Sequence, residues 1–597
     1  MDNNLDNLPK TTGEPLPQPT QTQAQPKAEP VFQPDAKPFS TPVPPLPQNP
    51  QPPYQQAPQA PQQAYYPQGY VTPAQYAVVE SPVVKAAKEL ASHFNGTLML
   101  TLSFVFSIAL VDLVLRGGQF NLGVGFGIPI IVALGWLLFL PMIIEKRKAL
   151  PRQVFISLIP TGILALCFGY FSSTPVKAIS VPVLLVVIIL QTAQISGISN
   201  ANLFSMRNAG ISLRTVFALP FECFGPAYSS MNGKREKGKG LNAGSKVLVA
   251  ALFSLPAVIF LIWIFAKSDA IFESYVQSFL SLIRIDATGI FLDVFFGGLI
   301  ALFIFPLVFA LKSGFKLEIK TGKGSKGIDW VYVASFLGIC ALVYLSYVAV
   351  QFTYFFDAAL PASHSSNINY SEYANRGFGE LCFIIALTFA VVMTAVHLTR
   401  KNEKGEIHPI VRIVLSVLSA SALIFVASAF FRVYLYTQTY GLTRSRVMGC
   451  WFIVTLGLCV LGLIAKIWVK NLNIAVIIGT VVVLMTIVLN LMNVDYNIAK
   501  YNVARYNQTG KLDISYLSEL SPDMIPALKG LIGTPKEKDA LALMRLAYRD
   551  LEDKRVGSWS VQQLRARDMI IKYKADELGV EESFSRIHGY SYEYYYD

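Results

Sequence analysis

Long apolar stretches alternate with short polar ones through the middle of the chain, from about residue 97 to residue 494. Each apolar stretch is near the ~20 residues that a helix needs to cross the hydrocarbon core of a bilayer. A backbone in lipid must satisfy its own hydrogen bonds, so these stretches predict helices. The pattern predicts an all-α, polytopic integral membrane bundle of about 11 spans. The predicted spans are 97–115, 122–144, 154–173, 179–197, 246–266, 289–311, 329–353, 380–398, 410–432, 447–468 and 473–493.

The regions on either side of the spans differ from them in composition. Residues 1–80 are rich in Pro and Gln, which predicts a disordered tail that leads into a juxtamembrane segment at 81–96. The transmembrane domain, 97–494, is followed by a small helical extramembrane domain at 495–580 and a Tyr-rich tail at 581–597. The Pro-rich tail is either a plain tether or a docking site for a cytosolic partner.

Capping residues indicate helices within the extramembrane domain. Thr534 and Glu537 have the spacing of a capping box and predict the start of one helix. Another helix is expected to start near Ser558 or Ser560 and to end at Gly579, a residue suited to the position after a helix.

Two shorter segments are typical of helices that lie along a bilayer surface. The segment 269–284 has aromatic and aliphatic residues near helical spacing, and the segment 213–226 is too short to span a bilayer. For 213–226, a re-entrant membrane segment stays open as an alternative.

Composition agrees with a membrane protein, since 53% of the residues are hydrophobic and 15% are charged. The net charge of +12 is concentrated in the connections after even-numbered spans, as in "EKRKALPRQ" and "NGKREKGKG". Cytoplasmic loops carry such an excess of Lys and Arg, so we expect a cytoplasmic N-terminus and an extracytoplasmic C-terminus. The basic surplus is thus a topology signal, and the expected partner is the lipid bilayer and not nucleic acid.

No catalytic, cofactor or metal motif stands out. The chain lacks HExxH, GxSxG and a phosphate-binding loop with its Lys, and its six cysteines form no CxxC pair. Its five histidines fall on separate segments. We therefore expect no cofactor and no metal, and the sequence leans away from an enzyme.

Polar residues suited to a site gather at the predicted outer ends of the spans. Ionisable groups in membrane helices are costly, which makes them candidates for function. If the last span continues as one helix, Asn497, Tyr501 and Arg505 share one of its faces. The candidates are Asp112, Asp293, Glu372, Arg376, Glu380, Arg432, Tyr440, Arg444, Arg446, Asp495, Asn497, Tyr501, Asn502 and Arg505. They form either ion pairs that clamp helix ends together or a polar pocket at the outer surface.

Three polar stretches carry a resemblance to a known family. They are "YSEYANRGFGEL", "RVYLYTQTYGLTRSRV" and "NVDYNIAKYNVARYNQTGKLDISYLSELSPDMIPAL". They resemble a bacterial membrane-protein family known only as a domain of unknown function, of the DUF4173 type and related to DUF4153. The resemblance implies a multi-pass protein of the bacterial plasma membrane, and it implies no activity.

Three functions follow from these observations. The leading hypothesis is an envelope protein that binds a small molecule, lipid or protein at its outer polar layer. A transporter is the second, and Pro129, Pro256 and Pro306 within the spans are places where its helices could break. A membrane enzyme acting on a lipid-linked substrate is the third, and it would need an outer acidic pair.

Overall fold

The computed structural model describes most of the chain after the N-terminal tail. The chain divides into two units, Met1–Ala77 and Val78–Asp597, and the first lies outside the described residues. The predicted Pro-rich tail and the segment 269–284 lie outside the described residues as well. The described residues are 82–92, 95–115, 125–144, 152–232, 261, 264–265, 287–313, 327–359, 378–402, 405–552 and 558–588.

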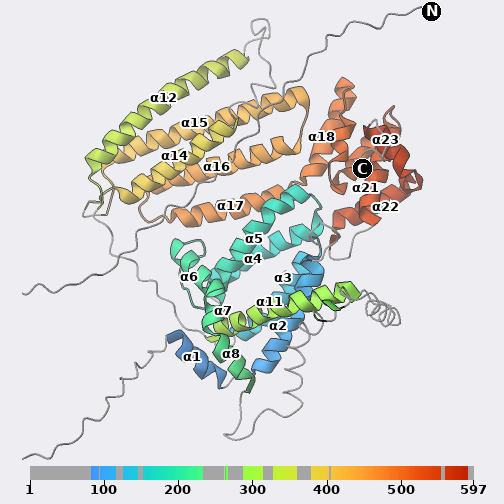
Figure 1. Ribbon diagram of the computed structural model, residues 1–597. Coiled ribbons are helices and arrows are strands. Elements are labelled where there is room, and N and C mark those ends of the chain that lie inside the picture. The colour runs from blue at the N-terminus through green and yellow to red at the C-terminus, as the bar shows by residue number, and fades with distance from the viewer. Residues whose placement is uncertain are drawn as a thin grey trace, which may run out of the picture. The chain divides into compact units, whose positions relative to one another are not determined.

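A first group of helices packs around α2 and α11. The helices α2, α3, α4 and α5 form successive antiparallel neighbours, and α11 packs along α2 (Figure 1). The bounds are α1 Pro82–Ala91, α2 Gly96–Leu110 with a π-helical turn Val111–Leu115, α3 Gly127–Ile144, α4 Arg152–Tyr170, α5 Thr174–Ile195, α6 Met206–Phe217, α7 Leu219–Glu222, α8 Phe224–Ser229 and α11 Ala287–Ser313.

A second group consists of α12, α14, α15 and α16, which lie side by side (Figure 1). Helix α17 follows α16 and also packs against α4 and α5, so it joins the two groups. The bounds are α12 Trp330–Ala359, α14 Phe378–Leu398, α15 Pro409–Tyr440, α16 Arg444–Trp468 and α17 Ile474–Leu491.

The predicted membrane fold is confirmed. Among the described residues, nine helices are long and apolar enough to cross a bilayer, and α4 contributes a shorter apolar stretch, Val154–Tyr170. Ten of the predicted spans correspond to these helices, while the fifth, 246–266, lies almost wholly outside the described residues. Helix α11 continues through Pro306 without a break, and α3 begins two residues before Pro129.

The bundle of long helices has two ends, which we call the cap end and the far end. The cap end is where α4 ends and α5 and α16 begin; the far end is where α5 and α16 end. Ser230 lies at the far end, where it is in contact with Gly96 at the start of α2. Gly297, near the start of α11, meets Ile108 near the other end of α2. Ser230 and the start of α11 thus lie at opposite ends of the helices.

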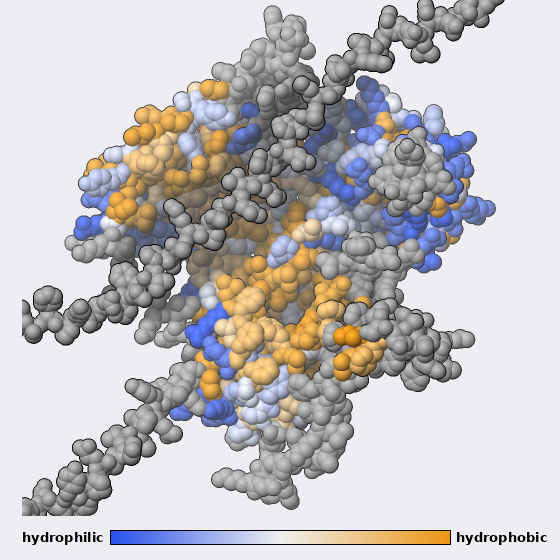
Figure 2. Space-filling view, in the orientation of Figure 1, coloured by the Kyte–Doolittle hydropathy of each residue, from blue (hydrophilic) through white to orange (hydrophobic). Residues whose placement is uncertain are grey.

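The residues after α17 form a separate helical layer, the cap domain, which we define as 494–588. Figure 2 shows hydrophilic residues over this layer and hydrophobic ones over the neighbouring bundle helices. The layer is nevertheless tied to the bundle by a common core, in which Leu517 and Leu528 pack in one cluster with Val176 of α5 and Val447 of α16. The helices are α18 Val494–Thr509, α19 Ile514–Ser518, α20 Ile525–Leu528, α21 Glu537–Glu552, α22 Val561–Lys572 and α23 Val580–His588.

Two local features of this layer differ from what the sequence suggested. The last span does not continue into α18, so the condition set for the shared face of Asn497, Tyr501 and Arg505 is not met; Asn493 adopts a left-handed conformation with φ of 44° and breaks the helix. Asn tolerates this region better than most residues, since its short polar side chain can bond locally. The last predicted helix ends at Lys572 and not at Gly579, and α23 follows it.

The predicted caps are partly realised. Ser560 is the N-cap of α22 and forms a full capping box, in which Gln563 is the reciprocal partner. Helix α21 begins at Glu537, whose carboxylate accepts a hydrogen bond from the backbone N–H of Gly533 and not from that of Thr534.

Candidate functional site

A bidentate ion pair lies at the cap end, between the first residue of α16 and the first turn of α18. The Nε atom of Arg444 donates to Oδ1 of Asp495 at 2.8 Å, and Nη2 donates to Oδ2 at 2.7 Å. The Asp495 side chain is fully buried, while that of Arg444 is 21% exposed. Paired planar groups of this kind form strong, directional bonds, so the pair fixes α18 against α16.

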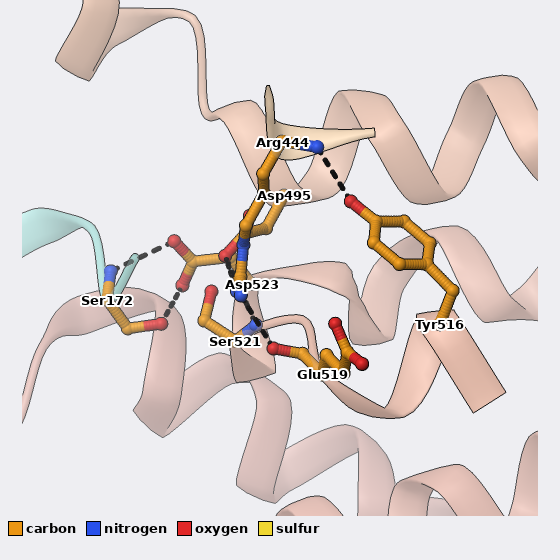
Figure 3. A network of polar contacts seen from close by, with 7 residues as sticks. All are labelled: Ser172, Arg444, Asp495, Tyr516, Glu519, Ser521 and Asp523. Carbon is orange, nitrogen blue, oxygen red and sulfur yellow. Dashed lines mark hydrogen bonds and ion pairs between the residues drawn. The ribbon is translucent and has the colours of Figure 1, made fainter. Parts of the chain in front are cut away.

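The pair receives further hydrogen bonds from the cap domain (Figure 3). Ser521 donates its backbone N–H to Asp495 at 3.1 Å, and Nη1 of Arg444 donates to the carbonyl of Glu519 at 2.7 Å. The backbone N–H of Arg444 donates to the hydroxyl of Tyr516 at 2.7 Å. Burial raises the pKa of that Tyr516 hydroxyl. A buried charged pair needs such additional bonds to offset the loss of water.

A second buried carboxylate, Asp523, connects the cap domain to the loop between α4 and α5. It is 1% exposed and accepts two hydrogen bonds from Ser172, at 2.9 Å from the backbone N–H and at 2.5 Å from the hydroxyl. Burial raises the pKa of Asp523 to about 6; the two bonds from Ser172 and the charge of Lys177 oppose that shift, and the charge of Asp495 adds to it. We call Arg444, Asp495, Asp523 and Ser172 the clamp.

Lys177 is the second basic residue near the clamp. It lies in the first turn of α5 and is 8% exposed, so a Lys is buried at the cap end of an apolar helix. Two buried carboxylates thus have a half-buried Arg and a buried Lys in their surroundings. Charge balance of this kind lets carboxylates stay ionised inside a protein.

A polar latch holds the loop between α15 and α16. Asn502 of α18 accepts from the backbone N–H of Leu442 at 3.1 Å and donates to its carbonyl at 2.8 Å. Gly441 has φ of +86°, and Nη1 of Arg446 donates to its carbonyl. The Arg446 guanidinium also lies 4.1 Å from the ring centre of Tyr436. Arg446 therefore binds a carbonyl and an aromatic ring in place of the predicted acidic partner.

The other predicted candidates are dispersed. Asp112 is exposed in the π-helical turn, and Glu380 is exposed at the start of α14. Asp293 is buried in α11, and Arg432 is buried within α15, which continues eight residues beyond it and so does not end there as predicted.

The remaining candidates lie near the latch or outside the described residues. Tyr440 ends α15 and packs against Tyr436 at 4.8 Å between ring centres. Asn497, Tyr501 and Arg505 lie on α18, where Asn497 donates to the carbonyl of Met492 across the helix break. Glu372 and Arg376 lie outside the described residues.

Sequence reasoning missed Ser172, Lys177, Tyr516, Ser521 and Asp523. A signal for three of them was present, since Tyr516, Ser521 and Asp523 lie in the stretch "TGKLDISYLSELSPDMIPAL", which carries the family resemblance. Nothing in the short segment around Ser172 distinguishes it from an ordinary polar loop between spans.

An open pocket of about 490 Å³ lies where the last span meets the cap domain, and we call it the junction pocket. Its lining combines two opposite charges, amides and apolar groups; it comprises Asn493, Tyr496, Pro526, Gln562, Arg565, Asp568 and Met569. Arg565 also donates to the hydroxyl of Tyr170, at the end of α4, at 2.8 Å. Within the described residues, no group of three or more His, Cys, Asp or Glu side chains could hold a metal ion.

Comparison with known families supports the resemblance seen in the sequence. A family model described as "Domain of unknown function (DUF4153)" matches residues 132–531, which is more than half of the chain. The chain belongs to this family. The DUF4153 match runs from within α3 to the end of α20 and the turn after it, so it contains the whole clamp. It ends before α22, which supplies most of the junction pocket. No curated protein and no solved structure matches the chain.

Proposed function

We propose that this DUF4153 protein is a binding protein of the membrane surface, which holds a small zwitterionic group in the junction pocket. A phospholipid headgroup is the natural source of such a group at this level, because Asn493 comes two residues after the end of the last span. The observation that carries the proposal is a pair of opposite charges one helical turn apart on α22, Arg565 and Asp568, both lining the pocket.

Neither charge is used within the described part of the chain to form an ion pair. Arg565 has a neutral partner, the hydroxyl of Tyr170, and its guanidinium lies 5.5 Å from that ring. Planar guanidinium groups suit phosphate oxygens, and a carboxylate suits an ammonium group. A phosphate and an amine joined by two carbons would match a cation and an anion at this spacing.

The pocket also offers a buried acceptor and apolar surface. The Oδ1 atom of Asn493 is buried and accepts no hydrogen bond from any described residue. An unpaired buried acceptor costs about 1–3 kcal/mol, and a ligand or water that donates to it removes that cost. Tyr496 and Met569 add apolar surface beside it. Pockets that combine apolar walls with a few polar groups are typical of small-molecule sites.

The clamp has a supporting role in this proposal. Asp495 and Asp523 are fully enclosed, so they are suited to holding α18 and α20 in place and not to meeting a ligand. Both helices contribute to the pocket, through Tyr496 and Pro526. A pocket on elements fixed by buried pairs stays pre-organised for its ligand.

Binding of phosphoethanolamine to the purified protein in detergent tests the proposal. We expect phosphoethanolamine to raise the thermal unfolding temperature of the wild type, and phosphate or ethanolamine alone to raise it less. Asp568→Asn and Arg565→Gln should each abolish most of the shift. Glu577→Gln and Lys572→Gln change exposed charges nearby and serve as controls that keep it. An equal shift in all five proteins, or none in the wild type, would contradict the proposal.

We also propose that the cap end faces outward from the cytoplasm in a bacterial plasma membrane. Basic residues of the described far-end segments support this orientation, since connections rich in Lys and Arg stay on the cytoplasmic side. They include Lys312, Arg400, Lys401, Lys466 and Lys470. Lys572→Cys, on an exposed position of α22, should react with an impermeant maleimide in intact cells. Reaction only after lysis would reverse the orientation.

A further inference from the structure

Helix α6 at the far end is turned with its polar side toward the protein. Its buried residues are Asn208, Ile211, Ser212 and Thr215, and three of these four are polar. Nδ2 of Asn208 donates to the carbonyl of Leu190 in α5 at 3.0 Å, and the hydroxyl of Ser212 donates to the same carbonyl at 3.3 Å. These bonds fix which side of α6 faces the bundle.

The opposite side of α6 is a stripe of exposed apolar residues. Met206, Leu213 and Phe217 recur at intervals of seven and four, which places them on one line along the helix. Met206 is 80% exposed and Phe217 is 58% exposed. The stripe continues after the helix with Phe221, which is 72% exposed. In water this arrangement would be unfavourable, because it buries polar groups and exposes apolar ones.

Two arginines lie along one side of this stripe. Arg207 and Arg214 are seven residues apart, so they share a line about a quarter-turn from Met206. Both are exposed, and Arg214 reaches Glu222 of α7 at 3.3 Å with its side chain still 49% exposed. Arginines beside an apolar stripe can extend their heads toward phosphate while the stem stays in the apolar layer.

The position of α6 to α8 in the fold agrees with the edge of a bilayer. Helix α6 packs on the far-end part of α5, and α7 and α8 pack against α11. The rings of Phe221 and Phe303 of α11 are 6.1 Å apart, so the short helices lie directly beside a spanning helix.

We infer that α6 to α8 form an in-plane membrane helix segment, in which the apolar stripe enters the acyl region and Arg207 and Arg214 bind the phosphates of anionic lipid. The sequence left a re-entrant segment open for 213–226. The hydrogen bonds of Asn208 and Ser212 favour the in-plane arrangement, because both go to the single carbonyl of Leu190 and so anchor α6 near the far end of α5. The anionic leaflet is the partner whose charge complements two exposed arginines above an apolar surface.

Lipid retention by the full chain tests the charge contribution. The protein is equilibrated in mixed phosphatidylglycerol and phosphatidylcholine, and the lipids retained after purification are counted by native mass spectrometry. Arg207→Gln with Arg214→Gln should lower the preference for phosphatidylglycerol by roughly 5-fold for each arginine, the effect of one basic residue at an anionic surface. Arg400→Gln with Lys401→Gln removes the same charge at the same end but away from α6. That control should change the preference much less.

Insertion of the stripe is tested separately. The added fluorescence of Phe217→Trp, taken as the difference from the parent protein, should be quenched by brominated phosphatidylglycerol and protected from acrylamide. The inference is overturned if acrylamide quenches the added Trp as it would an exposed residue. It is also overturned if the α6 double variant and the control pair lose phosphatidylglycerol preference equally. Monodisperse elution of each variant shows that its fold is retained.

Discussion

Replacing Asp495 by alanine tests whether the clamp holds the cap domain on the bundle. The change leaves the Arg444 guanidinium without its two carboxylate bonds, and it also frees the backbone N–H of Ser521. Asp495 is fully buried, so little water reached the pair before the change. Removing one partner of a buried pair costs about 3–5 kcal/mol.

The lower part of that range applies here. The Arg444 side chain is 21% exposed and keeps its bond to the carbonyl of Glu519, so part of its charge stays solvated or bonded. We therefore expect Asp495→Ala to cost about 3 kcal/mol in the free energy of opening the cap domain. That corresponds to an increase of roughly a hundredfold in the open population.

Amide hydrogen exchange measures this opening directly. Exchange of the amides in α18 and α20 should accelerate by about the same factor, while that of the amides in α2 and α11 should stay unchanged. Lys536→Met removes a partly exposed pair with Asp539 in the same domain and serves as the control. This control should change the free energy of cap opening, as obtained from the exchange rates, by less than about 1 kcal/mol.

A double variant separates the ion pair from the packing of its members. Arg444→Ala combined with Asp495→Ala should cost less than the sum of the two single changes, because neither charge is then left alone. If the costs are additive, or if Asp495→Ala changes exchange no more than Lys536→Met does, the clamp interpretation is refuted and the pair contributes no more than a surface contact.

Two further predictions concern the polar contacts around the clamp. The pKa of Asp523 is raised from 3.8 to about 6, so between these values its folded form binds a proton that the unfolded form has lost. The free energy of cap opening should therefore fall by about 2 kcal/mol as the pH rises from about 4 to about 6. Asp523→Asn should remove this dependence in exchange measured at both pH values. A flat profile in the wild type would contradict it. Gly441→Ala should destabilise the loop between α15 and α16 by about 1–3 kcal/mol, because the position has φ of +86° and the added Cβ would lie 2.7 Å from Oδ1 of Asn502. The loop of this variant should be cleaved faster by a protease than that of the wild type. An unchanged cleavage rate would contradict the prediction.

Much of the fold could be predicted from the sequence because the bilayer imposes a length. Helices such as α14 and α17 fall within a few residues of the predicted spans 380–398 and 473–493. Their bounds were predictable since an apolar stretch must match the hydrocarbon thickness. The capping box at Ser560 was predictable for a similarly local reason, because its partner Gln563 is three residues away.

The site was only partly predictable, because its contacts join distant segments. Ser172 and Asp523 are 351 positions apart, and no periodicity links them. The sequence offered several acids and several arginines at the outer ends of the spans, and periodicity shows which face of a helix a residue occupies but not which neighbour it meets. Packing of α18 against α16 selected Arg444 as the partner of Asp495 and gave Arg446 a carbonyl instead.

The sequence by itself determined that this chain is a helical membrane protein, where its spans lie and that its polar residues concentrate beside particular span ends. Those properties depend on local composition measured against the thickness of a bilayer. Tertiary structure alone decided the break at Asn493, the enclosure of Asp495 and Asp523, and the outward apolar side of α6. Each depends on which helix lies beside which, and that follows from packing summed over the whole bundle.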